Sequence, residues 1–243
     1  MKKWTKWMAA LLMACLAMTG CGTGTPKEDN NSGTGGNTPP QDVLIYAVNG
    51  DPQSFNPDMK SDDNAYAANQ NIYSRLVKMN ANDQIIPDLA ESWEYSEDGL
   101  TLTFHLHEGV KWHDGEPFTS EDVKWTLETM KEQKWTKSDS IASVESIECP
   151  DDNTVVLNLT QRDVAIVAKL GWYATFIMPE HIWNDPAYPD IATNPAAWNP
   201  VGTGPYKFEK YEAGVGTTLV KNEDYFDAEP IIEKLIFQVI PDQ

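Results

Sequence analysis

Hydrophobic and polar side chains alternate strictly between residues 100 and 107. The apolar positions are Leu100, Leu102, Phe104 and Leu106, and the polar ones are Thr101, Thr103, His105 and His107. A period of two predicts a β-strand with one buried and one solvent-facing side. Asp-Gly pairs at 98–99 and 114–115 flank the stretch, and glycine adopts the positive φ of a tight turn without steric cost. We predict a short antiparallel meander, with residues 93–95 on its incoming strand and 110–112 on its outgoing strand.

A helical pattern follows this meander. Thr119 has the character of an N-cap, and Asp122, three residues later, completes a capping box. Val123, Leu127 and Met130 then recur at the spacing of one helix face. The sequence therefore predicts an amphipathic helix that begins after Thr119 and buries this apolar face.

The rest of the chain after residue 42 mixes strand and helix patterns. The apolar run 43–48 contains β-branched residues and predicts a buried strand. Helical spacing predicts helices at 64–77 and 163–170, and short apolar runs predict strands at 144–149, 155–159, 176–178, 216–221 and 235–239. This mixture indicates an α/β architecture.

Residues 1–20 have the pattern of a lipoprotein signal peptide. A basic start precedes an apolar run that is too short to span a membrane as a mature helix. The run ends in the lipobox-like sequence MTGC, so we predict lipidation of Cys21 and a flexible linker over 21–42, which is rich in Gly, Thr, Asn and Pro. Ordinary secretory cleavage, with Cys21 as an incidental thiol, is the alternative. The lipid would hold the protein on the extracytoplasmic face of the cell membrane.

The charge of the chain and its cysteine content exclude some classes of partner and of chemistry. The chain has 18 Lys and Arg residues against 37 Asp and Glu residues, a formal net charge of −19 at pH 7. Such a charge repels nucleic acid and anionic lipid surfaces, so we predict no nucleic-acid partner. Cys149 lies at the end of a predicted strand and is interpreted as a small buried residue rather than a redox group, because the chain has no C-x-x-C.

The order of the short motifs identifies a family resemblance. SWE at 92–94, EDGLTLTFHL at 97–106 and GVKWHDGEPFTSEDVKWTLE at 109–128 are followed by PVGTGPY at 200–206 and NEDYF at 222–226. This series resembles the extracellular solute-binding protein family 5, the oligopeptide-, dipeptide- and nickel-binding proteins of ABC importers. The resemblance extends from about residue 43 to the end of the chain.

The resemblance implies a periplasmic-binding-protein-like (type II) α/β lobe with an inserted α+β subdomain. Residues 43–60 and 179–243 would form the first lobe, and 61–178 the inserted subdomain. Family members continue into a second lobe after the position of Gln243, so the resemblance implies that the second lobe is missing here and that the chain is a truncated product or a fragment.

The resemblance implies a protein that binds a solute and catalyses no reaction. The resemblance implies a monomeric protein, with no cofactor, that captures a peptide or another small solute and delivers it to ABC permease and ATPase subunits. A nickel chelate or another solute, such as a sugar, is the alternative to a peptide.

Five residues are candidates for ligand contact by their matched positions. Asn49, Gly50 and Asp51 follow the first predicted strand, and Asp51 is suited to a cationic ligand group. Trp172 and Tyr173 lie before the strand at 176–178, where large aromatic side chains supply apolar area with a polar tip. A turn role for Asp51 before Pro52, and plain packing for the two aromatic residues, are the alternatives.

An enzyme and a surface adhesin are the competing classes. His105, His107 and His113 are a conceivable zinc set. However, H-E-x-x-H and G-x-S-x-G are both absent from the chain, and the three histidines lie within the family's scaffold motif. We therefore predict no catalytic residue and no resident metal. A tethered adhesin would equally explain the linker and the anchor.

Overall fold

The computed structural model of the protein describes residues 42–57, 62–172 and 175–240. The predicted signal peptide, the lipidation site Cys21, the linker up to residue 41 and the predicted site residue Tyr173 lie outside these ranges. Within them, no helix has the length and apolar character that a membrane crossing requires.

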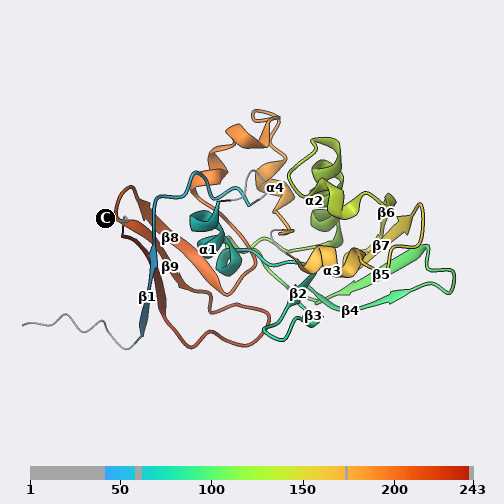
Figure 1. The fold of residues 1–243 in the computed structure, drawn as a ribbon, viewed down its shortest axis with the longest axis horizontal. Helices are drawn as coiled ribbons and strands as arrows, with labels where there is room; N and C mark the ends of the chain where they lie inside the picture. The colour runs from blue at the N-terminus through green and yellow to red at the C-terminus, as the bar shows by residue number, and fades with distance from the viewer. Residues whose placement is uncertain (1–41, 58–61, 173–174, 241–243) are drawn as a thin grey trace, which may run out of the picture. The chain divides into compact units, whose positions relative to one another are not determined.

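One four-stranded sheet joins the first described strand to three strands from residues 206–239 (Figure 1). In spatial order its strands are β1 (Val43–Val48), β10 (Lys234–Val239), β9 (Gly216–Lys221) and β8 (Tyr206–Glu212). β1 runs parallel to β10, and the other neighbours are antiparallel. Helix α1 (Asp63–Ile72) lies against this sheet, and its Ala68 and Ile72 share a buried cluster with Leu219 and Phe237.

The prediction that β1 is buried is wrong. Leu44, Ile45 and Tyr46 are 52%, 44% and 56% exposed, although the strand itself forms where the sequence predicts it. β1 is the end strand of its sheet, and among the described strands it pairs with β10 alone. An apolar run identifies a strand but does not tell an end strand from a central one, because both have the same composition.

A second four-stranded sheet carries the alternating pattern. Its spatial order is β4 (Ala90–Tyr95), β5 (Thr101–Leu106), β7 (Thr154–Leu159) and β6 (Val144–Asp151), all antiparallel. Leu102, Phe104 and Leu106 of β5 are buried, as the period of two predicts, whereas Leu100 lies before the strand and is 40% exposed. The predicted outgoing strand at 110–112 is wrong. It forms only one isolated bridge, Lys111 with Pro117, and β7 takes its place beside β5.

Helix α2 (Ser120–Glu132) confirms the predicted capping box and apolar face. Val123, Leu127 and Met130 are fully buried in the core of the second sheet. An Asp122 carboxylate oxygen accepts a hydrogen bond from the Thr119 backbone N–H at 3.0 Å. The predicted N-terminus of the helix is therefore formed by the side chain that the sequence indicates.

Shorter elements complete the described fold. They are β2 (Val77–Met79), β3 (Ile85–Pro87), η1 (Ser138–Ile141), α3 (Ile166–Gly171), α4 (Glu180–Trp183), η2 (Ile191–Thr193) and η3 (Pro195–Trp198). Two of them, β2 and β3, pair as a two-stranded antiparallel sheet. The helix predicted at 64–77 ends at Ile72, and the strand predicted at 176–178 is buried irregular chain instead. The hairpin predicted at 144–159 and the mixed α/β class are confirmed.

Candidate functional site

The loop after β1 is tied to the turn between β8 and β9. Asp51 is exposed, and its Oδ1 accepts a hydrogen bond from the Gly214 backbone N–H at 2.8 Å. Burial and the neighbouring Asp51 carboxylate raise the pKa of Tyr211. On the other side of the loop, a Cβ on Gly50 would lie 3.4 Å from the Asn64 side chain, in the first turn of α1. The loop that contains Asn49, Gly50 and Asp51 is thus held against the N-terminal end of α1.

Trp172 lines a pocket that Tyr66 and Gln70 of α1 also border. The pocket has a volume of about 360 Å³, and its described lining residues are Tyr66, Gln70, Arg75, Met79, Asn80, Gly171 and Trp172. Trp172 is 60% exposed, so packing between subdomains does not account for its position. A large aromatic side chain held at a pocket wall offers apolar area to a ligand at little conformational cost.

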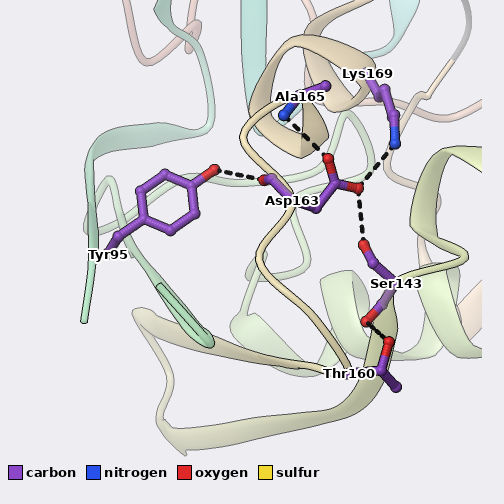
Figure 2. A network of polar contacts seen from close by, with 6 residues as sticks. All are labelled: Tyr95, Ser143, Thr160, Asp163, Ala165 and Lys169. Atoms are coloured by element: carbon purple, nitrogen blue, oxygen red, sulfur yellow. Dashed lines mark hydrogen bonds and ion pairs between the residues drawn. The ribbon is translucent and has the colours of Figure 1, made fainter. Parts of the chain in front are cut away.

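Trp172 is the C-cap residue of α3, and its backbone N–H donates to the Lys169 carbonyl oxygen. Figure 2 shows the network at the other end of α3, centred on Asp163. The Asp163 carboxylate accepts hydrogen bonds from the Ala165 backbone N–H at 3.0 Å, from Lys169 Nζ at 2.8 Å and from Ser143 Oγ at 2.9 Å. Burial raises the pKa of Asp163, but the bonds from Lys169 and Ser143 outweigh it, and the net shift is downward.

Arg75 also lines this pocket. Its guanidinium carbon lies 4.2 Å from the centroid of the Phe176 ring, and its Nη2 donates a hydrogen bond to Tyr66 Oη at 3.1 Å. Its backbone N–H donates to Asp88 Oδ2 at 2.8 Å. Burial raises the pKa of Asp88, against the opposing effect of Lys78. Arg75 was not predicted from the sequence, where its signal is weak: a single arginine inside the helix predicted at 64–77.

A second, smaller pocket adjoins the first. It has a volume of about 170 Å³, and its described lining residues are Leu44, Tyr46, Ala67, Gln70, Asn71, Leu235 and Phe237. Gln70 of α1 belongs to both pockets. The exposed side chains of β1 and Trp172 therefore border one continuous stretch along α1, which we name the α1 surface and define by Leu44, Tyr46, Gln70, Arg75 and Trp172.

The three histidines of the zinc alternative do not form a metal site. His113 is buried: its Nδ1 accepts from the Gly202 backbone N–H at 3.2 Å, and its Nε2 donates to the Gly204 carbonyl oxygen at 3.0 Å. Burial lowers the pKa of His113 to about 4. His105 and His107 lie on β5 or just after it, beside Glu94 and Glu91 at 3.7 and 4.0 Å. The described residues contain no group of three or more His, Cys, Asp or Glu side chains placed to hold a metal ion, so the zinc alternative is wrong.

Most of the chain matches a known protein family. The family model "Bacterial extracellular solute-binding proteins, family 5 Middle" matches residues 84–243. The dipeptide-binding protein of Escherichia coli is 31% identical over 222 residues, which is 82% of this chain and 41% of that protein.

Two solved structures share the fold. DppA from Helicobacter pylori, in complex with the peptide STSA, is 29% identical with a TM-score of 0.74, and the match covers 82% of this chain and 43% of that one. NikZ from Campylobacter jejuni, in complex with Ni(L-His), is 30% identical with a TM-score of 0.72, and the match covers 83% and 40%. The chain thus spans less than half the length of these relatives, and its α/β fold is that of a type II periplasmic binding protein. The chain belongs to the bacterial extracellular solute-binding proteins of family 5.

Proposed function

We propose that this chain supplies one wall of the solute-binding cleft of an ABC importer's binding protein, and that the solute is a peptide. The observation that carries this proposal is the α1 surface, where exposed apolar and aromatic side chains border two adjoining pockets. Monomeric soluble domains rarely leave such a stretch uncovered unless it meets a ligand or another part of a protein. The relatives that are named for peptide binding support this choice of ligand.

Peptide chemistry fits the surface. β1 is the end strand of its sheet, so its outer edge offers main-chain donors and acceptors to an extended chain without selecting its side chains. Tyr46 and Trp172 would then contact variable ligand side chains through broad apolar area. Binding would close this wall against a second lobe, because the closed state gives the ligand more contacts. The protein makes and breaks no covalent bond in this scheme, and permease and ATPase subunits move the solute.

We place the protein on the extracytoplasmic face of the cell membrane, held there by lipid on Cys21. This part of the proposal rests on the signal-peptide pattern, the MTGC sequence and the polar linker. We expect globomycin, which blocks lipoprotein signal cleavage, to leave a precursor that is larger by residues 1–20. A precursor that is processed normally in its presence would contradict lipidation at Cys21.

A nickel complex is the second candidate ligand. The similarity to NikZ, whose structure contains Ni(L-His), favours it. Such a ligand is small and compact, whereas the α1 surface extends over two pockets, so an extended peptide is the better fit.

Native mass spectrometry of the protein isolated from its own cells tests the proposal. We expect a heterogeneous set of small adducts that sequence as peptides after release. The variant Trp172→Ala, isolated from the same cells, should carry fewer adducts than the wild type. Val164→Ala is the control, since Val164 is 84% exposed and lines neither pocket of the α1 surface. Nickel with histidine instead of peptides would support the second candidate, and protein free of any solute would contradict both.

A further inference from the structure

The larger pocket of the α1 surface has a charge opposite to that of the chain as a whole. The formal net charge of the protein is −19, yet Arg75 alone carries a formal charge among the described residues that line this pocket. A positively charged group in a pocket wall is unusual in so acidic a protein, and it favours binding of a negatively charged ligand group.

The Arg75 side chain is held in place before any ligand arrives. Phe176 lies under the guanidinium plane at 4.2 Å from ring centroid to guanidinium carbon, and the Tyr66 hydroxyl accepts one of its N–H groups at 3.1 Å. A guanidinium fixed in this way presents a planar set of donors whose geometry matches a carboxylate. Holding the group on an aromatic ring also reduces the conformational entropy that binding would cost.

The remaining lining residues suit a carboxylate attached to an apolar or peptide body. Gln70 provides an amide group, and Met79 and Trp172 provide apolar area. Asp51, predicted to meet a cationic group, lines neither pocket, and its Oδ1 accepts a hydrogen bond from the Gly214 backbone N–H in the β8–β9 turn.

We propose that the pocket between Arg75 and Trp172 is a carboxylate subsite, in which the Arg75 guanidinium binds a carboxylate of the ligand. The inference rests on the proposed function, since it assigns one end of the same cleft. The carboxylate is either the C-terminus of a peptide or an acidic side chain, and the two sources are separable by experiment.

Isothermal titration of the native protein, stripped of ligand, tests the subsite with three probes. They are the tripeptide Ala-Leu-Ala as the free acid, its C-terminal amide, and the amide of Ala-Glu-Ala. We expect Arg75→Gln to weaken binding of one carboxylate-bearing probe by about ten- to hundredfold, the range for loss of a charge-assisted hydrogen bond. The neutral amide should bind the variant and the wild type equally.

Two further variants keep the result interpretable. Arg75→Lys retains the charge without the planar fork and should give an intermediate loss. Lys78→Gln removes a neighbouring cation, whose Nζ lies 3.4 Å from Asp88 Oδ1. Because Lys78 does not line the pocket, this variant should bind all three probes as tightly as the wild type does. Thermal unfolding of each variant shows whether it is folded at the titration temperature.

The outcomes separate the two proposals. A selective loss for the free acid assigns the subsite to a peptide C-terminus, and a selective loss for the Ala-Glu-Ala amide assigns it to an acidic side chain. An equal loss for all three probes, or none, overturns the subsite while the cleft proposal stands. If the wild type binds none of the probes, peptide capture fails and the subsite fails with it.

Discussion

The α-carbon of Gly202 lies directly against the carbonyl group of Ile72, the last residue of α1. A Cβ at position 202 would be 2.0 Å from the Ile72 oxygen, and one at Gly204 would be 2.5 Å from the Asn71 oxygen. The Gly204 backbone N–H also donates to that Ile72 oxygen at 2.8 Å. The two glycines of the GTG motif are therefore required by close approach of two backbone segments, and they fix the C-terminal end of the helix that borders the α1 surface.

Substitution of Gly202 by alanine should destabilise the protein by more than 3 kcal/mol, about the upper end of ordinary single substitutions, because the clash is with backbone and cannot be relieved by a side-chain rotation. The control is Gly50→Ala, whose new methyl group would meet the Asn64 side chain at an ordinary 3.4 Å. Urea denaturation of both variants gives the free energies of unfolding. Equal stability of the two variants would contradict the close-approach argument.

The Asp122 carboxylate joins three segments of chain. It accepts hydrogen bonds from the Thr119 N–H at 3.0 Å, from the Glu180 N–H at 3.0 Å and from Trp112 Nε1 at 3.4 Å. Asp122→Ala should therefore cost about 3 kcal/mol of unfolding free energy, through the lost cap and the buried donors left without an acceptor. Glu121→Ala, which removes only an exposed contact to Lys124 at 3.8 Å, should change it by less than about 0.5 kcal/mol. A loss no larger than that of the Glu121 variant would show that water replaces the carboxylate.

The buried His113 should make stability depend on pH between about 4 and 6.5. Its folded-state pKa is lowered from 6.5 to about 4, so the unfolded chain binds a proton that the folded chain does not. The stabilisation is fully present above pH 6.5 and is lost as the pH falls toward 4, by about 3 kcal/mol in total. His113→Gln, which keeps one donor and one acceptor, should remove this part of the pH profile. Parallel profiles for wild type and His113→Gln would show that the histidine titrates normally.

Local pattern was sufficient to predict most elements of the fold. The alternation at 100–107 and the capping box at Thr119 depend on neighbouring residues alone, and both are confirmed. The strand expected at 110–112 failed for a non-local reason: β7, which is about fifty residues away, forms the ladder with β5 instead. The prediction that β1 is buried failed for the same kind of reason, because the position of β1 at the end of the sheet depends on where β8, β9 and β10 lie.

Less of the candidate site than of the fold could be predicted from the sequence. Trp172 was singled out through the family resemblance, and the structure puts it at a pocket wall. Arg75 had no motif around it, and its role follows only from contacts with Phe176 and Tyr66, at sequence separations of 101 and 9 residues. Such pairs are made by tertiary packing, which one sequence does not specify locally.

The network around Asp163 should control the position of Trp172. Asp163→Asn removes the negative charge that Lys169 and Ser143 bind, and charge-assisted hydrogen bonds of this kind contribute about 1.5–3 kcal/mol each. We expect α3 to loosen at its first turn and Trp172 to become more mobile, with weaker ligand binding and a lower free energy of unfolding. Fluorine NMR of protein with 5-fluorotryptophan, assigned by Trp172→Phe, measures this as a broadened or shifted Trp172 resonance. Ser146→Ala is the control, because Ser146 lies on β6, shortly after Ser143, but contacts Asn158 instead of Asp163. An unchanged Trp172 resonance in Asp163→Asn would show that α3 and the pocket wall are held by packing alone.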